Sequence, residues 1–162
     1  MTGCTASYRI NNLPGSMDTH RLDKQKSVYI TIPQDGAYKS KPYFGSGQVV
    51  AQAVAAAFSR VAARVHIEEK QLTNEETIKL AKKLGAGYVV IPVIAHWEKR
   101  ATEWSGRPSK MSIRLTIYDT NTGDQIFSTS IEGRSRIMSM TSTSPESLLK
   151  DPLTQYVGKI YK

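Results

Sequence analysis

The chain has 162 residues, of which 40% are hydrophobic and 22% are charged, as in ordinary globular domains. This composition excludes collagen-like, mucin-like and fully disordered proteins, and the length fits one domain. Lys and Arg number 22 against 14 Asp and Glu, so the net charge is +8 and favours anionic partners: nucleic acid, phospholipid headgroups or anionic envelope polymers. The sequence contains no run of about 18 apolar residues, the length that a membrane-spanning helix needs. The single cysteine excludes an internal disulfide.

The first 26 residues are polar and contain two segments typical of loops, Asn11-Asn12 and Pro14-Gly15. They show no sustained period of two or about 3.6 residues, the periods of strands and helices. We therefore expect residues 1–26 to form a flexible tether and residues 27–162 to form one folded domain.

The first half of this domain is predicted as strand, helix, strand and helix. Residues 27–32 are rich in β-branched and aromatic side chains, which favours a strand. After a loop over 34–45, an alanine-rich segment predicts a helix from Ser46 to about Arg64. A short strand over 65–67 is followed by a second helix, which Thr73 or Asn74 would cap and Gly85 would end.

The second half is predicted as three strands and a helix. Residues 88–95 are apolar on both faces and predict a central strand, in which a bulge or an unpaired edge would accommodate Pro92. After a long connection over 96–109, residues 111–118 alternate as a half-buried strand does. A turn leads to a returning strand over 125–136, and Ser144-Pro145 opens a last helix.

Together these elements predict an α/β domain of two or three layers. Its mixed sheet has about five strands, in the order β-α-β-α-β-β-β-α.

Three patterns that could support catalysis or cofactor binding are incomplete. Gly45-Ser46-Gly47 opens a helix, but Val50 replaces the third glycine of a dinucleotide fingerprint. The three histidines are scattered and none belongs to a metal-binding pair. Adjacent glutamates, as in 68–69 and 75–76, point to different faces and favour solvated side chains. We therefore predict no catalytic residue, no metal site, no cofactor and no enzyme activity.

The connection from His96 to Lys110 is the segment richest in tryptophan and cationic residues, the side chains most enriched at interface hot spots. We predict that it binds a partner through Trp97, Arg100, Trp104 and Arg107. Trp104 is expected to be exposed beside Ser105-Gly106, and Trp97 to lie closer to the core. Two alternatives stay open: a structural loop, and a platform on which nucleic-acid bases stack.

The start of the chain, Met1-Thr2-Gly3-Cys4, resembles a bacterial lipobox, whose cysteine becomes acylated. The resemblance implies that acyl chains on Cys4 hold the protein on a membrane. The charged and apolar regions of a signal peptide do not precede Cys4, so the numbering is expected to begin partway into a precursor or at a cut made there. Thr5 stands where Asp would resemble an inner-membrane retention signal, which implies the outer membrane.

Residues 84–92, Leu-Gly-Ala-Gly-Tyr-Val-Val-Ile-Pro, resemble a helix, Gly-Ala and buried-strand signature of small bacterial envelope domains. These are the curli-secretion lipoprotein, the lipoprotein activators of peptidoglycan synthases and the N-terminal domain of the Tol-system β-propeller protein. The hairpin turn over 118–123 is similar to theirs. Residues 93–106 more closely resemble an uncharacterised bacterial lipoprotein family, a domain of unknown function.

The resemblance covers roughly residues 26–160. It implies a lipid-anchored module on the periplasmic side of the outer membrane that serves assembly or regulation and has an envelope protein as partner. It leaves the partner's identity and the oligomeric state open. The alternatives are a cytoplasmic nucleic-acid-binding domain, which the net charge supports, and a small hydrolase.

Overall fold

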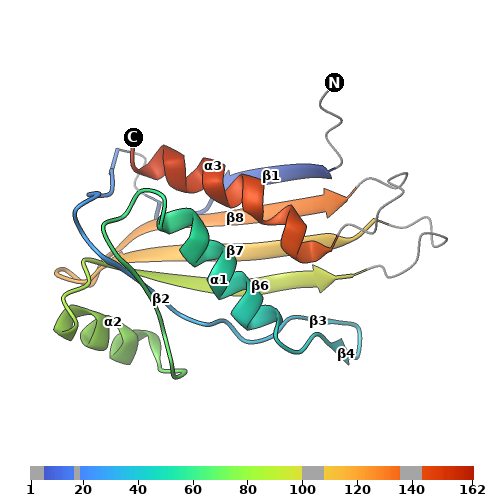
Figure 1. Cartoon of the computed structure of the whole chain (residues 1–162), viewed down its shortest axis with the longest axis horizontal. Coiled ribbons are helices and arrows are strands. Elements are labelled where there is room, and N and C mark those ends of the chain that lie inside the picture. The colour runs from blue at the N-terminus through green and yellow to red at the C-terminus, as the bar shows by residue number, and fades with distance from the viewer. Residues whose placement is uncertain (1–5, 17–18, 100–107, 136–143) are drawn as a thin grey trace.

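The structure is a computed structural model that describes residues 6–16, 19–99, 108–135 and 144–162. These residues form a six-stranded mixed sheet with two helices on one face and a third helix on the other (Figure 1). The predicted α/β class is confirmed, and the predicted elements occur in their predicted order. The structure adds one strand at the start and a short hairpin before the first helix.

The strands of the sheet lie in the order β1-β8-β7-β6-β2-β5. Its antiparallel centre consists of β6 (Tyr88–Glu98), β7 (Lys110–Asp119) and β8 (Gln125–Ser135). Two short strands, β2 (Val28–Ile30) and β5 (Val65–Ile67), continue the sheet as parallel neighbours beside β6. The sheet is therefore parallel at one end and antiparallel over most of its width.

The segment predicted as a flexible tether belongs to the folded domain, so that prediction and the boundary after residue 26 were wrong. Residues Ala6–Asn12 form β1, which pairs antiparallel with β8 along its whole length. Ala6 and Ile10 pack against the core, and Leu22 is only 4% exposed. Ala6, Tyr8 and Ile10 alternate with Ser7, Arg9 and Asn11, so β1 has the period of a half-buried strand. The sequence analysis missed this period because it covers only six residues and the polar segment that follows does not continue it.

Helix α1 (Ser46–Phe58) ends at Phe58 and not near Arg64 as predicted. Beyond Phe58 the chain turns to enter the sheet. The N–H of Ala63 donates to the carbonyl of Lys24, and the carbonyl of Arg64 accepts from Val28. These backbone groups cannot also serve a helix, so pairing with the sheet ends α1 although the alanine-rich sequence favours continuation.

The hairpin of β3 (Ala37–Tyr38) and β4 (Lys41–Pro42) lies in the predicted loop before α1. It sits at the end of the sheet at which β1 begins (Figure 1). The Tyr38 ring meets the His96 ring edge to face, with centroids 5.6 Å apart, so the hairpin borders β6.

Helix α2 (Asn74–Lys83) is confirmed with both of its predicted ends. Thr73 and Glu76 form a capping box, in which each side chain accepts a hydrogen bond from the other residue's N–H. After the helix, Gly85 adopts a φ of 79°. Ala81 packs with Tyr29 and Val89 in a small second core, so α2 covers only the parallel end of the sheet.

Strand β6 accommodates Pro92 because one edge of the strand is unpaired at this residue, the second of the two predicted arrangements. Its pairing with β2 ends at Val90, whereas its pairing with β7 continues to Glu98. The irregularity in register falls between Ile94 and His96, not at Pro92. His96, Trp97 and Glu98 therefore belong to a strand, and the connection predicted to start at His96 starts after Glu98.

The C-terminal segment begins with the short 3-10 helix η1 (Pro145–Leu148) and continues as α3 (Lys150–Ile160). Pro152 stands in the first turn of α3, where a missing N–H costs no helical hydrogen bond. Helices α1 and α3 pack together over the main core, on the face of the sheet opposite α2.

Candidate interaction surface

Strands β1, β8, β7 and β6 have one face that none of the described helices covers. Helices α1 and α3 lie over the opposite face, and α2 reaches only the parallel end (Figure 1). Because side chains alternate along a strand, every second residue of the long strands points to this uncovered side. Four exposed cations point there, and we call the surface they define the open basic face: Arg9, Lys110, Arg114 and Arg134.

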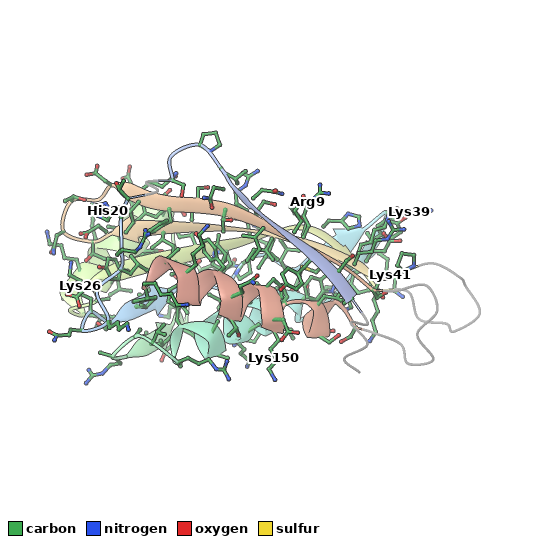
Figure 2. All side chains as sticks on the ribbon, turned by 90° about the horizontal axis from the view of Figure 1, so that it is seen from above. Arg9, His20, Lys26, Lys39, Lys41 and Lys150 are labelled. Atoms are coloured by element: carbon green, nitrogen blue, oxygen red, sulfur yellow. The ribbon has the colours of Figure 1, made fainter. Side chains whose placement is uncertain are left out.

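The register brings these cations together in rows across the strands. In the first row, Lys110 on β7 lies directly opposite Arg134 on β8, and Arg134 lies opposite Ser7 on β1. In the second row, Ser112, Glu132 and Arg9 lie side by side. Arg114 follows in the third row, opposite Ser130. Figure 2 shows Arg9 on the side of the sheet away from α3, and Lys150 on the helix side.

The cations of the open basic face are not neutralised within the described part of the chain. The two ion pairs formed by described residues are Lys26 with Asp119, at 3.7 Å, and His96 with Glu98, at 3.1 Å. Neither includes Arg9, Lys110, Arg114 or Arg134. Glu132 is the only carboxylate among the described residues that shares this face without such a pair, so the face keeps an excess of positive charge.

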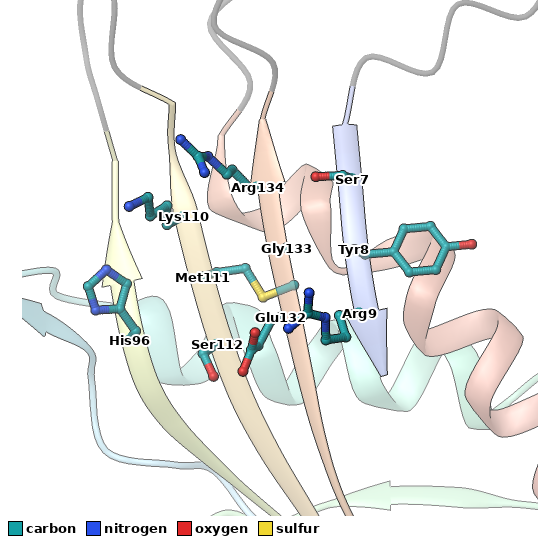
Figure 3. A pocket seen from close by; sticks show the side chains of 10 residues that line it. All are labelled: Ser7, Tyr8, Arg9, His96, Lys110, Met111, Ser112, Glu132, Gly133 and Arg134. Carbon is teal, nitrogen blue, oxygen red and sulfur yellow. The ribbon is translucent and has the colours of Figure 1, made fainter. Parts of the chain in front are cut away.

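The face is hollowed between the first two rows. A cavity of about 480 Å³ opens there, with Arg9, Lys110 and Arg134 among its lining residues together with Ser7, Ser112 and Glu132. Figure 3 shows Lys110 and Arg134 side by side at its upper end, and Tyr8 turned away from it. Cations, hydroxyls and one carboxylate can together bind a ligand that carries both an anionic group and hydroxyl groups.

His96 closes the cavity on the side of β6. Its Nε2 lies 3.1 Å from Oε2 of Glu98, a carboxylate that is only 3% exposed. The pair therefore fixes the imidazole at the rim of the open basic face. Glu98 itself lies directly opposite Lys110 in the β6–β7 register, so a carboxylate borders the first row on the side of β6.

A second groove lies where the parallel strands end, the usual ligand position in open α/β sheets. Its one buried carboxylate, Glu68, is 4% exposed and accepts a hydrogen bond from the Thr77 hydroxyl at 3.2 Å. Burial raises the pKa of Glu68, while hydrogen bonds from Thr77 and the Ile32 backbone act in the opposite direction. Glu68 thus links the end of β2 to α2, which is a structural role.

The glycine-flanked start of α1 is occupied by the chain itself. The Asp35 carboxylate accepts hydrogen bonds from the N–H groups of Gly45, at 3.0 Å, and Gly47, at 2.7 Å. An anion at these amides would have to displace Asp35. Among the described residues, no three His, Cys, Asp or Glu side chains gather as a metal site would require.

The predicted partner residues fall into two groups. Trp97 is 1% exposed and lies in the core, which agrees with its expected position near the core and keeps its indole away from a partner. Arg100, Trp104 and Arg107 lie outside the described residues, as does Cys4. The predicted partner residues did not include Arg9, Lys110, Arg114 or Arg134. Lys110 was the last residue of the predicted cationic connection, and the alternation in 111–118 placed Arg114 among the polar, outward-facing positions.

The fold of this chain is similar to that of several solved bacterial proteins. PelC from Paraburkholderia phytofirmans, solved as a dodecamer, has a TM-score of 0.65 and 15% identity, over 92% of this chain and 95% of PelC. XCC0632 from Xanthomonas campestris has a TM-score of 0.52 and 11% identity, over 90% of this chain and 87% of its own. The hypothetical protein CT253 from Chlamydia trachomatis has a TM-score of 0.50 and 13% identity, over 83% and 94%.

Residues 20–160 match the model of the family described as Domain of unknown function (DUF4823), and the chain belongs to this family. The predicted membership of an uncharacterised family is thereby confirmed. No curated protein shows a significant match to the chain. Within the described residues, no helix is long and apolar enough to cross a membrane.

Proposed function

We propose that the protein is an interaction module of the bacterial cell envelope, held on the periplasmic side of the outer membrane by acyl chains on Cys4. The observation that carries the proposal is the open basic face, an uncovered sheet surface whose cations form no ion pair with another described residue. Unneutralised cations on a rigid sheet are suited to binding and give no basis for bond-breaking chemistry, which needs an activated nucleophile or a positioned acid and base. The module is therefore a non-enzymatic component or regulator of a larger assembly.

The chain position of Cys4 supports the anchor. Ala6 already pairs with Ser135 in the sheet, so Thr5 alone separates the cysteine from the folded domain. The two steps from Cys4 to Ala6 span at most about 7 Å, so acylation would hold the domain directly against the bilayer surface. This replaces the long tether that the sequence predicted.

The segment between β6 and β7 contributes a second contact in this proposal. It joins Glu98 to Lys110 and so leaves and re-enters the sheet beside the first row of the open basic face. Its residues Arg100, Trp104 and Arg107 have the composition of a hot spot for a protein partner. The structural likeness to dodecameric PelC supports self-assembly as part of the function.

The anchor is tested by labelling with radioactive palmitate in the native host. The wild-type chain is expected to take up label and stay in the membrane pellet after a high-salt wash, and Cys4→Ser to lose both properties. Ser16→Ala is the matched control, because it changes a residue outside both the lipobox and the cavity of the open basic face and is expected to behave like the wild type. An unlabelled wild-type chain in the cytosol would contradict the proposal and favour a nucleic-acid-binding domain.

The partner contact is tested by co-purification from host membranes with Trp104→Ala. Loss of a stably co-purified envelope protein, with an unchanged circular dichroism melt, is the expected result. If every partner is retained, Trp104 belongs to a structural loop.

A further inference from the structure

We infer that the first row of the open basic face binds the anionic headgroups of phospholipids in the membrane that carries the protein. The inference rests on the proposed anchor at Cys4 and names the ligand of the face. Lys110 and Arg134 provide the binding cations, and Arg9 in the second row supports them.

The first argument is the arrangement of like charges. Lys110 and Arg134 lie directly opposite each other on β7 and β8, and like charges in such cross-strand pairs destabilise a sheet. Glu98 lies opposite Lys110 on β6, but the ion pair that it forms with a described residue is the one with His96, and Arg134 faces Ser7 on its other side. Neither cation has an ion-pair partner among the described residues. A phosphate between the two side chains would turn this repulsion into two charge-assisted hydrogen bonds.

The second argument is distance from the anchor. Ser7 lies opposite Arg134 in the first row and follows Cys4 by three residues, a span of at most about 10 Å. The first row is therefore the part of the open basic face that acyl chains on Cys4 would bring to the headgroups. Lys39 and Lys41 of the β3–β4 hairpin lie at the same end of the molecule (Figure 2).

The third argument is the chemistry of the cavity. Its lining combines Arg9, Lys110 and Arg134 with the hydroxyls of Ser7 and Ser112 and the carboxylate of Glu132. A glycerophosphate headgroup has a phosphate that the cations can bind, and hydroxyls that can donate to the serine oxygens and to the Glu132 carboxylate. A volume of about 480 Å³ is within the range of small-molecule sites.

The experiment measures vesicle co-sedimentation of the unacylated Cys4→Ser protein, so acyl chains do not contribute. Vesicles contain either phosphatidylcholine alone or phosphatidylcholine with phosphatidylglycerol. Binding is expected only to the phosphatidylglycerol vesicles. In the same background, Lys110→Gln with Arg134→Gln should weaken it about 25-fold, because each basic residue near an anionic surface contributes about fivefold.

The matched control is Lys150→Gln with Lys159→Gln, which removes the same charge from exposed positions of α3 on the opposite side of the sheet. This variant should retain most of the binding. Equal weakening by both pairs would overturn the inference, because net charge alone would then explain the affinity. Binding to soluble anionic polysaccharide without binding to phosphatidylglycerol vesicles would also overturn it.

Soluble glycerol 3-phosphate separates a true headgroup site from diffuse attraction. At millimolar concentration it should displace the protein from vesicles, whereas sodium chloride of equal ionic strength should displace it less. Equal displacement by both would show diffuse electrostatic attraction and would overturn the proposed headgroup site. Failure of palmitate labelling would remove the anchor and leave this assay unaffected, so the two proposals can fail separately.

Discussion

At the scale of single residues, burial places Trp97 in the core. Trp97 lies on the inner face of β6 opposite Met111, while His96 and Glu98 beside it point to the open basic face. Gly36 packs so closely against Trp97 that a Cβ at Gly36 would lie 2.6 Å from the Trp97 Cβ. The indole is thus part of a tight core contact.

Trp97→Ala is expected to lower the free energy of unfolding by about 3–5 kcal/mol, as large deletions in protein cores do. Urea unfolding followed by circular dichroism measures the change. Val93→Ala, on the same strand but 49% exposed, is the control and should change stability by less than about 1 kcal/mol. Similar effects of both substitutions would mean that Trp97 is not a core residue.

The buried carboxyl group of Glu68 predicts a pH dependence of stability. Burial raises the pKa of Glu68 in the folded state, so the folded protein binds this proton more tightly than the unfolded chain. The resulting stabilisation is complete below the ordinary pKa of a glutamate and is lost as the pH rises through the raised pKa.

Glu68→Gln keeps an oxygen that can accept from Thr77 but cannot ionise. Relative to wild type, this variant should therefore gain stability as the pH rises from the ordinary pKa of a glutamate, about 4, through the raised pKa of Glu68. Denaturant unfolding across this pH range measures the difference, and Glu69→Gln is the exposed neighbouring control. A difference that shrinks with rising pH would show that Glu68 is more acidic in the fold.

At the scale of elements, β1 is the unpredicted strand with the largest consequence for the proposed function. It covers the edge of β8 with a seven-residue ladder and brings Ser7 and Arg9 into the open basic face. Without β1, the long edge of β8 would present unpaired backbone groups to other chains.

Deleting residues 1–12 should lower the free energy of unfolding by about 2 kcal/mol or more, since Ile10 loses its packing. In a domain of this size that corresponds to a fall in Tm of about 4–8 °C. Deleting residues 1–5 alone is the control, because it leaves the β1–β8 ladder in place. If both deletions melt together with the full chain, β1 contributes no stability and acts as a tether after all.

At the scale of the whole molecule, the two faces of the sheet differ in how they are used. The main core fills one face beneath α1 and α3, whereas the second core is small and leaves four strands uncovered. A large uncovered sheet face with a net positive charge is better suited to binding or assembly than to stabilising the fold.

Self-assembly is the prediction that belongs to this scale. Multi-angle light scattering of the unacylated protein should give a mass several times the 18.0 kDa of one chain, with dissociation on dilution. Tyr8→Asp, on the exposed β1 strand and outside the lipid row, tests whether β1 lies at the contact between copies. A monomer at every concentration would restrict the proposal to an acylated module that acts as a single copy.

Much of the architecture could be predicted from the sequence because the decisive signals are local. The capping box of Thr73 and Glu76, the glycine after α2 and the alternation in 111–118 each act within a few residues. The family resemblance rested on the same local patterns and was confirmed over residues 20–160. Trp97 could likewise be expected near the core, because it follows an apolar run.

Only the tertiary structure decided what depends on partners far apart in the chain. β1 becomes a strand because β8 offers it a register, and α1 stops at Phe58 because Ala63 and Arg64 are needed at Lys24 and Val28. The open basic face exists for the same reason. Arg9 on β1 precedes the cations of β7 and β8 by about 100 residues in sequence, and strand pairing places them all in adjacent rows.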